Sequence, residues 1–427
     1  MKIESINELD LKRLTRKSYG DDETLERRVA EILKKVREEG DEALYQLTEE
    51  LDGVDLRECG LKVTPQEWVE AYEKVDAEFL VAIRAAKENI LLFHEKQKRT
   101  SWIEPSEDGS ILGQLLRPLQ RVGIYVPGGT ASYPSSVLMN ALPAVVAGVE
   151  EIVMVSPPRK DGTLLPEVLV AAAEAGVKEV YKIGGAQGIA ALAYGTKLIS
   201  SVDKITGPGN IYVTLAKKQV FGTVDIDMLA GPSEILILAD DSAKPEELAA
   251  DLLSQAEHDR LASPILVSPD RDILEETIAQ VEGQLASLPR SDIARDSWEN
   301  FGAAILVSDL EEGMALANII APEHFELVVE DPMAWLGRVR NAGAVFLGRF
   351  SPEPVGDYFA GPNHVLPTGG TARFYSPLNV DTFLKKINVI GYSEEALKRD
   401  AEKIALLARR EGLEAHARAV EVRFDER

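Results

Sequence analysis

The sequence predicts an α/β protein with two parallel β-sheets and smaller helical segments at both ends. Two observations predict this class. From residue 121 onward, short runs rich in Val, Ile and Leu alternate with longer stretches that suit crossover helices. This alternation is typical of parallel sheets whose strands are buried on both faces. Several of the runs also end in Gly- or Pro-rich turns, where strands commonly stop.

The predicted strands fall into two sets along the chain. In the first set they are residues 122–126, 152–155 and 180–183, with crossover helices at 136–148 and 166–176. The first of these strands ends at Pro127-Gly128-Gly129. In the second set they are residues 235–238, 265–267, 304–307, 325–329 and 344–347. Each set is long enough to form a sheet of its own, so the chain is expected to hold two α/β domains.

Helices are predicted outside these two sets. Leu25, Val29, Ile32 and Val36 repeat at helical spacing, and Gly40 ends that run. A second amphipathic helix is expected around residues 79–93, and a C-terminal helix that begins near residue 393 breaks at residue 412. Residues 1–20 show no apolar face, which suggests an arm that packs on another subunit.

These elements give the following domain division. We expect the N-terminal helices to pack on the second sheet, with the first sheet inserted between them. The predicted parts are an arm at 1–20, a first α/β domain at 21–120 plus 236–380, an inserted α/β domain at 121–235, and a C-terminal helical extension at 381–427.

Bulk composition excludes several classes of function. The net charge is −24, with 71 acidic against 47 basic residues, so a nucleic acid would be repelled. The single cysteine, Cys59, forms no intrachain disulfide, which fits a reducing compartment. The apolar stretch 141–149 is interrupted by Pro143 and Gly148 and is too short to span a bilayer. The first residues carry no apolar signal core, and we expect a cytoplasmic protein without a membrane segment.

Polar segments around four of the five histidines are the candidates for chemistry. Gln255 and His258 are three residues apart near the end of a predicted helix, so both can bind one metal ion. Taken alone, this pair is explained more simply as a polar helix end that faces water. Glu323 and His324 follow Pro322 at the entrance of a strand, where a carboxylate and an imidazole suit acid–base chemistry. A surface pair in a loop is the alternative.

Two further segments complete this set. Asp357 and His364 lie in one Gly/Pro-rich segment, which is expected to be a rigid loop that carries binding groups. An Asp that only makes a turn is the alternative. His416 lies in the terminal segment, where a solvated helix explains it equally well. Together the side chains of Gln255, His258, Asp357 and His416 form an N/O ligand set that suits zinc, with manganese or cobalt as substitutes.

The standard G-x-G-x-x-G fingerprint for dinucleotides is absent from the sequence. Residues 183–190 nevertheless predict a strand, a tight Gly turn and a helix start, and residues 206–210 form another Gly-rich turn. Amides at such a helix start can bind phosphate oxygens. Glycine turns after strands are usually only turns, so each signal is weak by itself.

These segments, in this order, resemble the histidinol dehydrogenase family over nearly the whole chain. The resemblance is carried by Ile124–Gly129, Gly184–Gln187, Gly207–Asn210, Ala230–Glu234, Gln255–His258, Ala321–His324, Gly361–His364 and Glu411–His416. It implies a homodimer of two large domains like incomplete Rossmann folds, with small extensions exchanged between subunits.

The resemblance also implies the composition of the site. One zinc ion per subunit would be held by Gln255, His258 and Asp357 together with His416 of the partner subunit. The implied substrate-binding residues are Ser233, Gln255, His258, His324, Asp357, His364, Glu411 and His416, and the implied NAD contacts are Tyr125, Gln187 and Asn210.

The implied reaction is the NAD-dependent oxidation of L-histidinol to L-histidine through L-histidinaldehyde, the last step of histidine biosynthesis. His324 would act as the general base and Glu323 would activate water, with two NAD used per turnover. Two rival functions remain open from the residues alone. A zinc hydrolase would use Glu323 as the base on a metal-bound water and would need no dinucleotide. A metal-stabilised scaffold would turn over nothing, although the Glu323–His324 pair argues against it.

Overall fold

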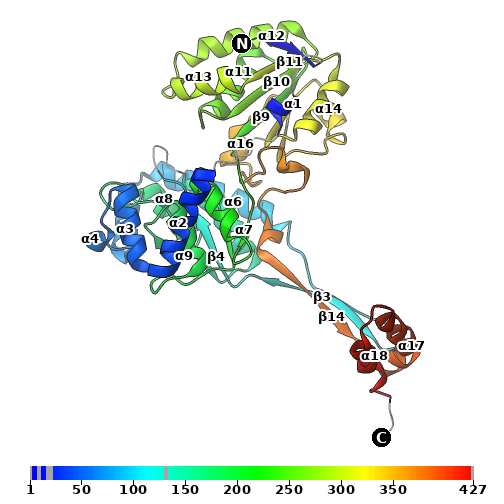
Figure 1. The fold of residues 1–427 in the computed structure, drawn as a ribbon. Coiled ribbons are helices and arrows are strands. Elements are labelled where there is room, and N and C mark those ends of the chain that lie inside the picture. The colour runs from blue at the N-terminus through cyan, green and yellow to red at the C-terminus, as the bar shows by residue number, and fades with distance from the viewer. Residues whose placement is uncertain (1, 7–10, 16–22, 129–132, 425–427) are drawn as a thin grey trace. The chain divides into compact units, whose positions relative to one another are not determined.

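The computed structural model describes residues 2–6, 11–15, 23–128 and 133–424 (Figure 1). Gly129 of the predicted Gly/Pro turn, and half of the predicted arm, lie outside these residues. The chain forms two compact units, one of residues 1–97 and 119–383 and one of residues 98–118 and 384–427. Within the described residues, no helix combines the length and the apolar character that crossing a membrane requires.

A five-stranded sheet in the first unit is parallel throughout and has the strand order β6-β5-β4-β7-β8. Its strands are β4 (Arg121–Tyr125), β5 (Glu151–Val155), β6 (Glu179–Tyr181), β7 (Lys204–Thr206) and β8 (Asp225–Ile226). The helices between them are α7 (Pro134–Ala147), α8 (Pro166–Glu174), α9 (Gly185–Tyr194) and α10 (Ile211–Val220). The chain winds outward from β4 in both directions, so the order reverses between β4 and β7. Open α/β sheets bind ligands at such a switch point, beyond the carboxyl ends of the strands.

A six-stranded parallel sheet in the same unit has the order β1-β11-β10-β9-β12-β13. Its strands are β1 (Ile3–Ser5), β9 (Glu234–Ala239), β10 (Ser263–Ser268), β11 (Ala303–Leu306), β12 (His324–Val328) and β13 (Ala344–Leu347). The helical segments around it are α1 (Leu11–Leu14), α11 (Pro245–Ala256), α12 (Arg271–Leu285), α13 (Ser291–Asn300), α14 (Leu310–Ile320), α15 (Pro332–Leu336), α16 (Glu353–Tyr358), η2 (Thr371–Arg373) and η3 (Val380–Phe383). Here the order reverses between β9 and β12. The two parallel sheets confirm the predicted fold class.

Period-two alternation along the strands places an apolar layer on each face of the six-stranded sheet. In β9, Ile235 and Ile237 face one core together with the apolar side of α11, whereas Leu236 and Leu238 face another core together with α14. All four side chains have no exposed surface. A strand with both faces buried needs this continuous apolar run, which is why the sequence pattern predicted it.

The N-terminal helices pack on the five-stranded sheet, and the prediction that they pack on the second sheet was wrong. These helices are α2 (Glu23–Glu39), α3 (Asp41–Asp52), α4 (Leu56–Cys59), α5 (Pro65–Lys74) and α6 (Ala77–Glu95). Val29 and Val36 of α2 share a core with Ala190 of α9, and Ile83 and Ile90 of α6 share a core with α7. Helical spacing reveals an apolar face, but it does not reveal which sheet that face covers.

Part of the predicted arm belongs to the chain's own sheet. Residues 3–5 form β1 and pair in parallel with residues 304–306 of β11. Leu14 is buried in the core of the same sheet. The remaining arm residues, 1, 7–10 and 16–20, lie outside the described part of the chain.

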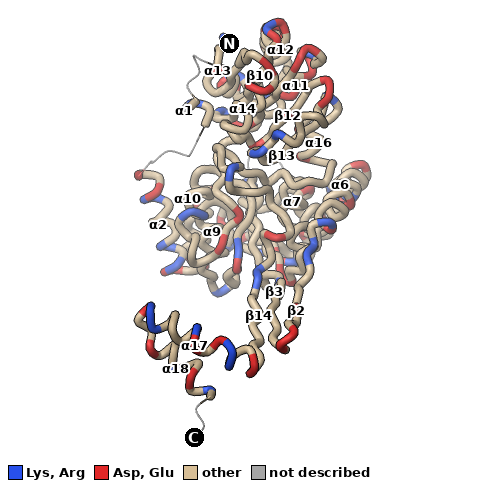
Figure 2. The backbone as a smooth tube through the Cα atoms, turned by 90° about the vertical axis from the view of Figure 1, so that its right-hand side faces the viewer, with Lys and Arg blue, Asp and Glu red and all other residues tan. Residues whose placement is uncertain are grey.

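The second unit combines an antiparallel sheet with two helices. The sheet has the order β14-β3-β2, formed by β2 (Trp102–Pro105), β3 (Ile111–Pro118) and β14 (Leu384–Gly391). The helices α17 (Glu394–Arg410) and α18 (Glu414–Glu421) follow, so the predicted helical extension begins with a strand that the sequence did not predict. Figure 2 shows acidic and basic residues interspersed on α2 and α17, which suits helix faces in contact with water.

Candidate active site

Helix α11 carries two polar side chains to the amino-terminal edge of the six-stranded sheet. Pro245 begins the helix, and the apolar side of the helix is buried against the sheet. Gln255 lies in the last turn and has no exposed surface, yet neither its Oε1 nor its Nε2 has a hydrogen-bond partner within the described ranges of the chain. His258 follows just beyond the helix, where its backbone N–H donates to the carbonyl of Gln255 at 3.2 Å. Burial lowers the pKa of His258, which favours the neutral imidazole that binds metals.

Glu323 and His324 lie at the seam between β9 and β12, where the strand order of this sheet reverses. His324 is the first residue of β12 and is 4% exposed. Its Nδ1 lies 3.0 Å from the backbone oxygen of Glu234 in β9, so this nitrogen carries the proton and donates it. Its Nε2 has no hydrogen-bond partner among the described residues. Glu323 is equally buried, and its Oε2 accepts the backbone N–H of Glu234 at 2.9 Å. Because both side chains are buried, the alternative of a surface pair in a loop does not hold.

The turn that leads into this pair is strained. Ala321 ends helix α14 with φ of 56° and is the only non-glycine residue with a positive φ in the described part of the chain. A left-handed alanine costs about 1 kcal/mol or more. Such strain is found most often at functional sites, where the surrounding structure holds the residue in place.

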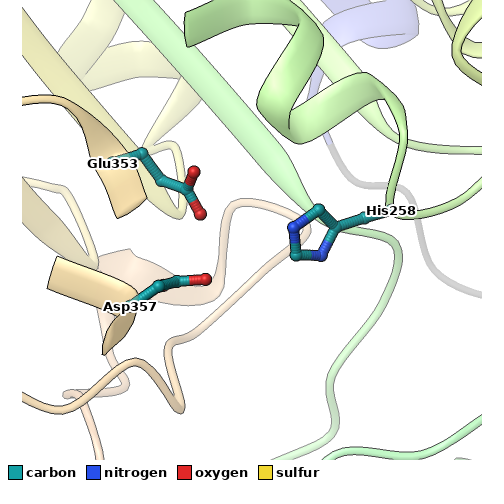
Figure 3. Close-up of side chains that lie close together, drawn as sticks. All are labelled: His258, Glu353 and Asp357. Atoms are coloured by element: carbon teal, nitrogen blue, oxygen red, sulfur yellow. The ribbon is translucent and has the colours of Figure 1, made fainter. Parts of the chain in front are cut away.

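Helix α16 adds two carboxylates one turn apart. The Gly/Pro-rich segment that was predicted to be a loop begins as this short helix, because its prolines occupy the first turn. Glu353 and Asp357 lie close to His258, and ligand atoms of all three lie within 4.8 Å of one another (Figure 3). Asp357 Oδ1 lies 3.8 Å from His324 Nε2, and His364 Nδ1 lies 3.9 Å from the same oxygen. Four of the predicted site residues thus gather in one place: His258, His324, Asp357 and His364.

Charge is concentrated in this cluster. Burial alone would lower the pKa of His324, but the nearby carboxylates, Glu323 foremost, raise it to about 10. Burial raises the pKa of Glu323 to about 7 and, with the charge of Asp357, that of Glu353 to about 8. Burial opposes ionisation of Asp357 too, but His324 and His364 together hold its pKa well below its usual range. Perturbed groups that face one another in this way mark functional sites.

A cavity of about 510 Å³ adjoins the cluster. His324, Asp357 and His364 line it together with apolar side chains such as Phe346 and Leu366. A cavity of this size with a few convergent polar groups suits a small molecule. Ser233 lies one residue before β9, at the same edge of the sheet.

Glu411 and His416 belong to the second unit, where both are exposed at the junction of α17 and α18. The first unit by itself therefore supplies Gln255, His258 and Asp357 of the predicted ligand set.

The predicted cofactor residues lie at the carboxyl edge of the five-stranded sheet, around its switch point. Tyr125 ends β4, and its hydroxyl oxygen accepts the N–H of Gly185 at 3.2 Å. Gln187 is buried in the first turn of α9, and its Nε2 donates to Asp52 at 3.4 Å. Asn210 caps α10, where its Oδ1 accepts two backbone N–H groups at 3.0 and 3.2 Å.

A second cavity, of about 520 Å³, lies at this carboxyl edge. Asp52 lines it together with residues that follow β4 and β5, such as Gly128 and Ser156. Its position and size suit part of a dinucleotide. Tyr125, Gln187 and Asn210 lie at the same edge of the sheet but do not line this cavity, so their contact with a dinucleotide stays a prediction.

Sequence reasoning missed Glu353. The signal that could have found it is the spacing of Glu353 and Asp357, which is i, i+4 and places two carboxylates on one face of a helix. The surrounding Pro and Gly residues concealed that helix.

A parallel sheet with a cofactor-type switch point, together with a buried cluster of imidazoles and carboxylates, defines the class of this protein as an α/β enzyme. Comparisons with known proteins give the family. The family model described as histidinol dehydrogenase matches residues 15–424. The histidinol dehydrogenase of Moorella thermoacetica is 60% identical over 396 residues, which cover 93% of each chain. That of Bacillus subtilis is 54% identical over 423 residues, which cover 99% of each.

A solved structure agrees with these relatives. The crystal structure of histidinol dehydrogenase from Elizabethkingia anophelis aligns with a TM-score of 0.91 at 40% identity, covering 97% of this chain and 95% of that one. The chain therefore belongs to the histidinol dehydrogenase family and is an oxidoreductase.

Proposed function

We propose that this protein oxidises L-histidinol to L-histidine through L-histidinaldehyde, with NAD as the oxidant and one zinc ion per subunit, as the last step of histidine biosynthesis. The observation that carries the proposal is the buried cluster of His258, Asp357 and His324 in a chain of this family. The names of the similar proteins support the substrate.

The donor set supports a metal at this cluster. Gln255 is fully buried, and no described residue is a hydrogen-bond partner of its two side-chain polar atoms, which is costly unless a ligand or an ion satisfies them. We assign the metal to Gln255, His258, Asp357 and His416 of the partner subunit. When bound, zinc supplies an anchor for the imidazole and amine of histidinol, and NAD accepts a hydride in each of the two oxidations.

His324 acts as the general base in both oxidations. Its Nδ1–H is held by the carbonyl of Glu234, so Nε2 is the nitrogen that takes the proton of the alcohol. Loss of that proton and of a hydride from carbon leaves the aldehyde. A neutral imidazole is required, and a divalent cation beside Asp357 would offset the carboxylates that keep His324 protonated.

Glu323 activates water for the second oxidation. Its Oε2 lies 3.6 Å from His324 Nδ1, so the two groups are neighbours in the site. Water adds to the aldehyde to give a hydrate, and the carboxylate of Glu323 takes the proton that water loses. Removal of a second hydride and a second proton, again by His324, yields the carboxylic acid.

Remaining contacts complete the proposed site. Ser233, His364 and Glu411 bind the substrate, and Tyr125, Gln187 and Asn210 contact NAD. A homodimer with shared sites is supported by the exposed apolar side chains of the second unit, such as Ile390 at 75% and Leu407 at 65% exposure.

An absorbance assay for NADH tests the proposal directly. Purified enzyme with L-histidinol and NAD is expected to form two NADH per histidinol, to stop after treatment with a chelator, and to recover with added zinc. Formation of a product without any formation of NADH would favour the zinc hydrolase instead. A chelator-dependent fall in melting temperature without any turnover would favour the scaffold.

A further inference from the structure

Glu353 is a buried carboxyl group with one oxygen that no donor among the described residues satisfies. It is 1% exposed, and its Oε2 accepts the hydroxyl of Ser254 at 3.0 Å. No hydrogen-bond donor reaches its Oε1 in the described part of the chain. Burying a carboxylate is costly unless a cation or a donor compensates it. The free oxygen therefore indicates a group that Glu353 is built to bind.

The position of Glu353 identifies that group as a cation. Its carboxylate and that of Asp357 are both directed toward the His258 ring (Figure 3), with ligand atoms of the three residues within 4.8 Å of one another. No lysine or arginine among the described residues forms an ion pair with either carboxylate. Two ligands of one zinc ion lie at most about 4 Å apart, since each lies about 2 Å from the metal. A shift of under about 1 Å would therefore bring all three atoms within reach of one ion.

Charge balance also favours a cation as the partner of Glu353. The four ligands of the proposed function carry one negative charge, that of Asp357, against two positive charges on zinc. The carboxylate of Glu353 makes the buried site neutral, which lowers the cost of keeping the ion there.

We infer that Glu353 binds the zinc ion of the substrate-free enzyme as an additional ligand and gives up this position when histidinol binds. The inference rests on the proposed function, because it assumes that zinc occupies this cluster. Zinc in proteins takes four ligands and at times five, so no position on the ion would be left for Glu353 once the two substrate nitrogens join the protein ligands. Ser254 then holds the released carboxylate.

Metal affinity measured with and without substrate tests this inference. Chelator competition gives the zinc dissociation constant of the wild type and of Glu353→Gln, first without ligand and then with saturating histidinol but no NAD. We expect the variant to bind zinc about 10- to 100-fold more weakly without histidinol. The difference should shrink severalfold when histidinol is present.

Two results would overturn the inference. If the variant binds zinc as tightly as the wild type and only its KM for histidinol rises, Glu353 contacts the substrate amine instead. If the loss of affinity is equal with and without histidinol, Glu353 is not displaced. Absence of zinc from the wild type would instead reject the proposed function.

A matched control separates this effect from a general effect of removing a carboxylate. Glu174→Gln makes the same chemical change at a partly buried glutamate that pairs with Arg84 beside the five-stranded sheet. Its zinc affinity is expected to equal that of the wild type. If Glu353→Gln does not fold, Glu353→Asp is the substitute: it keeps the charge, but its shorter side chain places the oxygens farther from the ion. It is expected to show the same substrate-dependent loss of zinc affinity.

Discussion

Lys217 and Asp227 form a buried ion pair that holds both backbone groups of Gly207. Lys217 Nζ donates to the carbonyl of Gly207 at 3.0 Å, and the N–H of Gly207 donates to Asp227 at 2.8 Å. Both side chains are 3% exposed or less. Gly207 has a φ of 118°, and a Cβ there would lie 2.1 Å from the carbonyl oxygen of Tyr125. The pair thus fixes the turn that leads to Asn210 at the switch point.

Lys217→Met should weaken NADH binding while zinc content and the KM for histidinol stay unchanged. The buried charge left on Asp227 should also lower the free energy of unfolding by about 3–5 kcal/mol. The dissociation constant of NADH, from its fluorescence, and denaturant unfolding measure the two effects. The double variant with Asp227→Asn removes both charges and should regain part of the stability. An unaltered NADH affinity in a folded Lys217→Met protein would show that the pair has a structural role only.

His324→Ala should lower turnover by roughly 10²–10⁴-fold, because it removes the imidazole that takes the proton of the alcohol. Zinc content, measured on the purified protein, should remain that of the wild type. Turnover close to wild type would remove His324 from the mechanism.

Glu323→Gln should slow the second oxidation and leave the rate of the first nearly unchanged. The amide cannot take a proton from water, whereas His324 Nε2 can still deprotonate the alcohol. A single-turnover experiment should therefore release one NADH quickly and the second slowly. Equal rates for both would mean that another group activates water.

A shared site predicts complementation between inactive variants. His258→Asn and His416→Ala should each lose zinc, since each lacks one proposed ligand. Co-expression should restore activity to about a quarter of the wild-type value, because half of the dimers are mixed and each mixed dimer has one intact site. If mixtures stay inactive while each variant folds and dimerises, both histidines act within one subunit or His416 is no ligand.

The protonation of His324 should depend on the metal. In the zinc-free protein its pKa is raised to about 10, above the unfolded value near 6.5. The raised pKa contributes stability that is fully present below about pH 6.5 and is lost as the pH rises toward 10. Zinc should lower this pKa and so shift the loss to lower pH. Nitrogen NMR of labelled histidine with and without zinc measures the change, and an identical pKa in both states would contradict the role given to the metal.

Much of the fold follows from local pattern in the sequence. Residues 235–238 form a continuous apolar run and residues 325–329 form one interrupted only by Glu326, and both lie in interior strands of the six-stranded sheet. The strands β2 and β3 were not predicted, because their apolar residues form short runs that Glu104 and Gly113 interrupt. The packing of α2 on the five-stranded sheet was also out of reach, since it depends on contacts between distant segments.

The site shows the same limit. His258, His324 and Asp357 were chosen from the sequence for their ligand and acid–base chemistry, and they lie together in the structure. Glu353 was missed because Pro354 and Gly356 suggested a loop. Gly356 is in fact needed for packing, since a Cβ there would lie 2.7 Å from the ring of Phe346. Such close approaches are invisible in a sequence.

His324 begins an interior strand of the six-stranded sheet, where it pairs with Ile235 on one side and with Ala344 on the other. Most catalytic groups lie on loops, which open locally at small cost. Here the amide of the proton acceptor should be among the slowest in the chain to exchange with deuterium. On heating, the strand pairing at His324 should therefore persist until the whole domain unfolds. The ends of α11 and α16 can unfold earlier and release the metal. Thermal inactivation that zinc reverses would be the outward sign of this difference in rigidity.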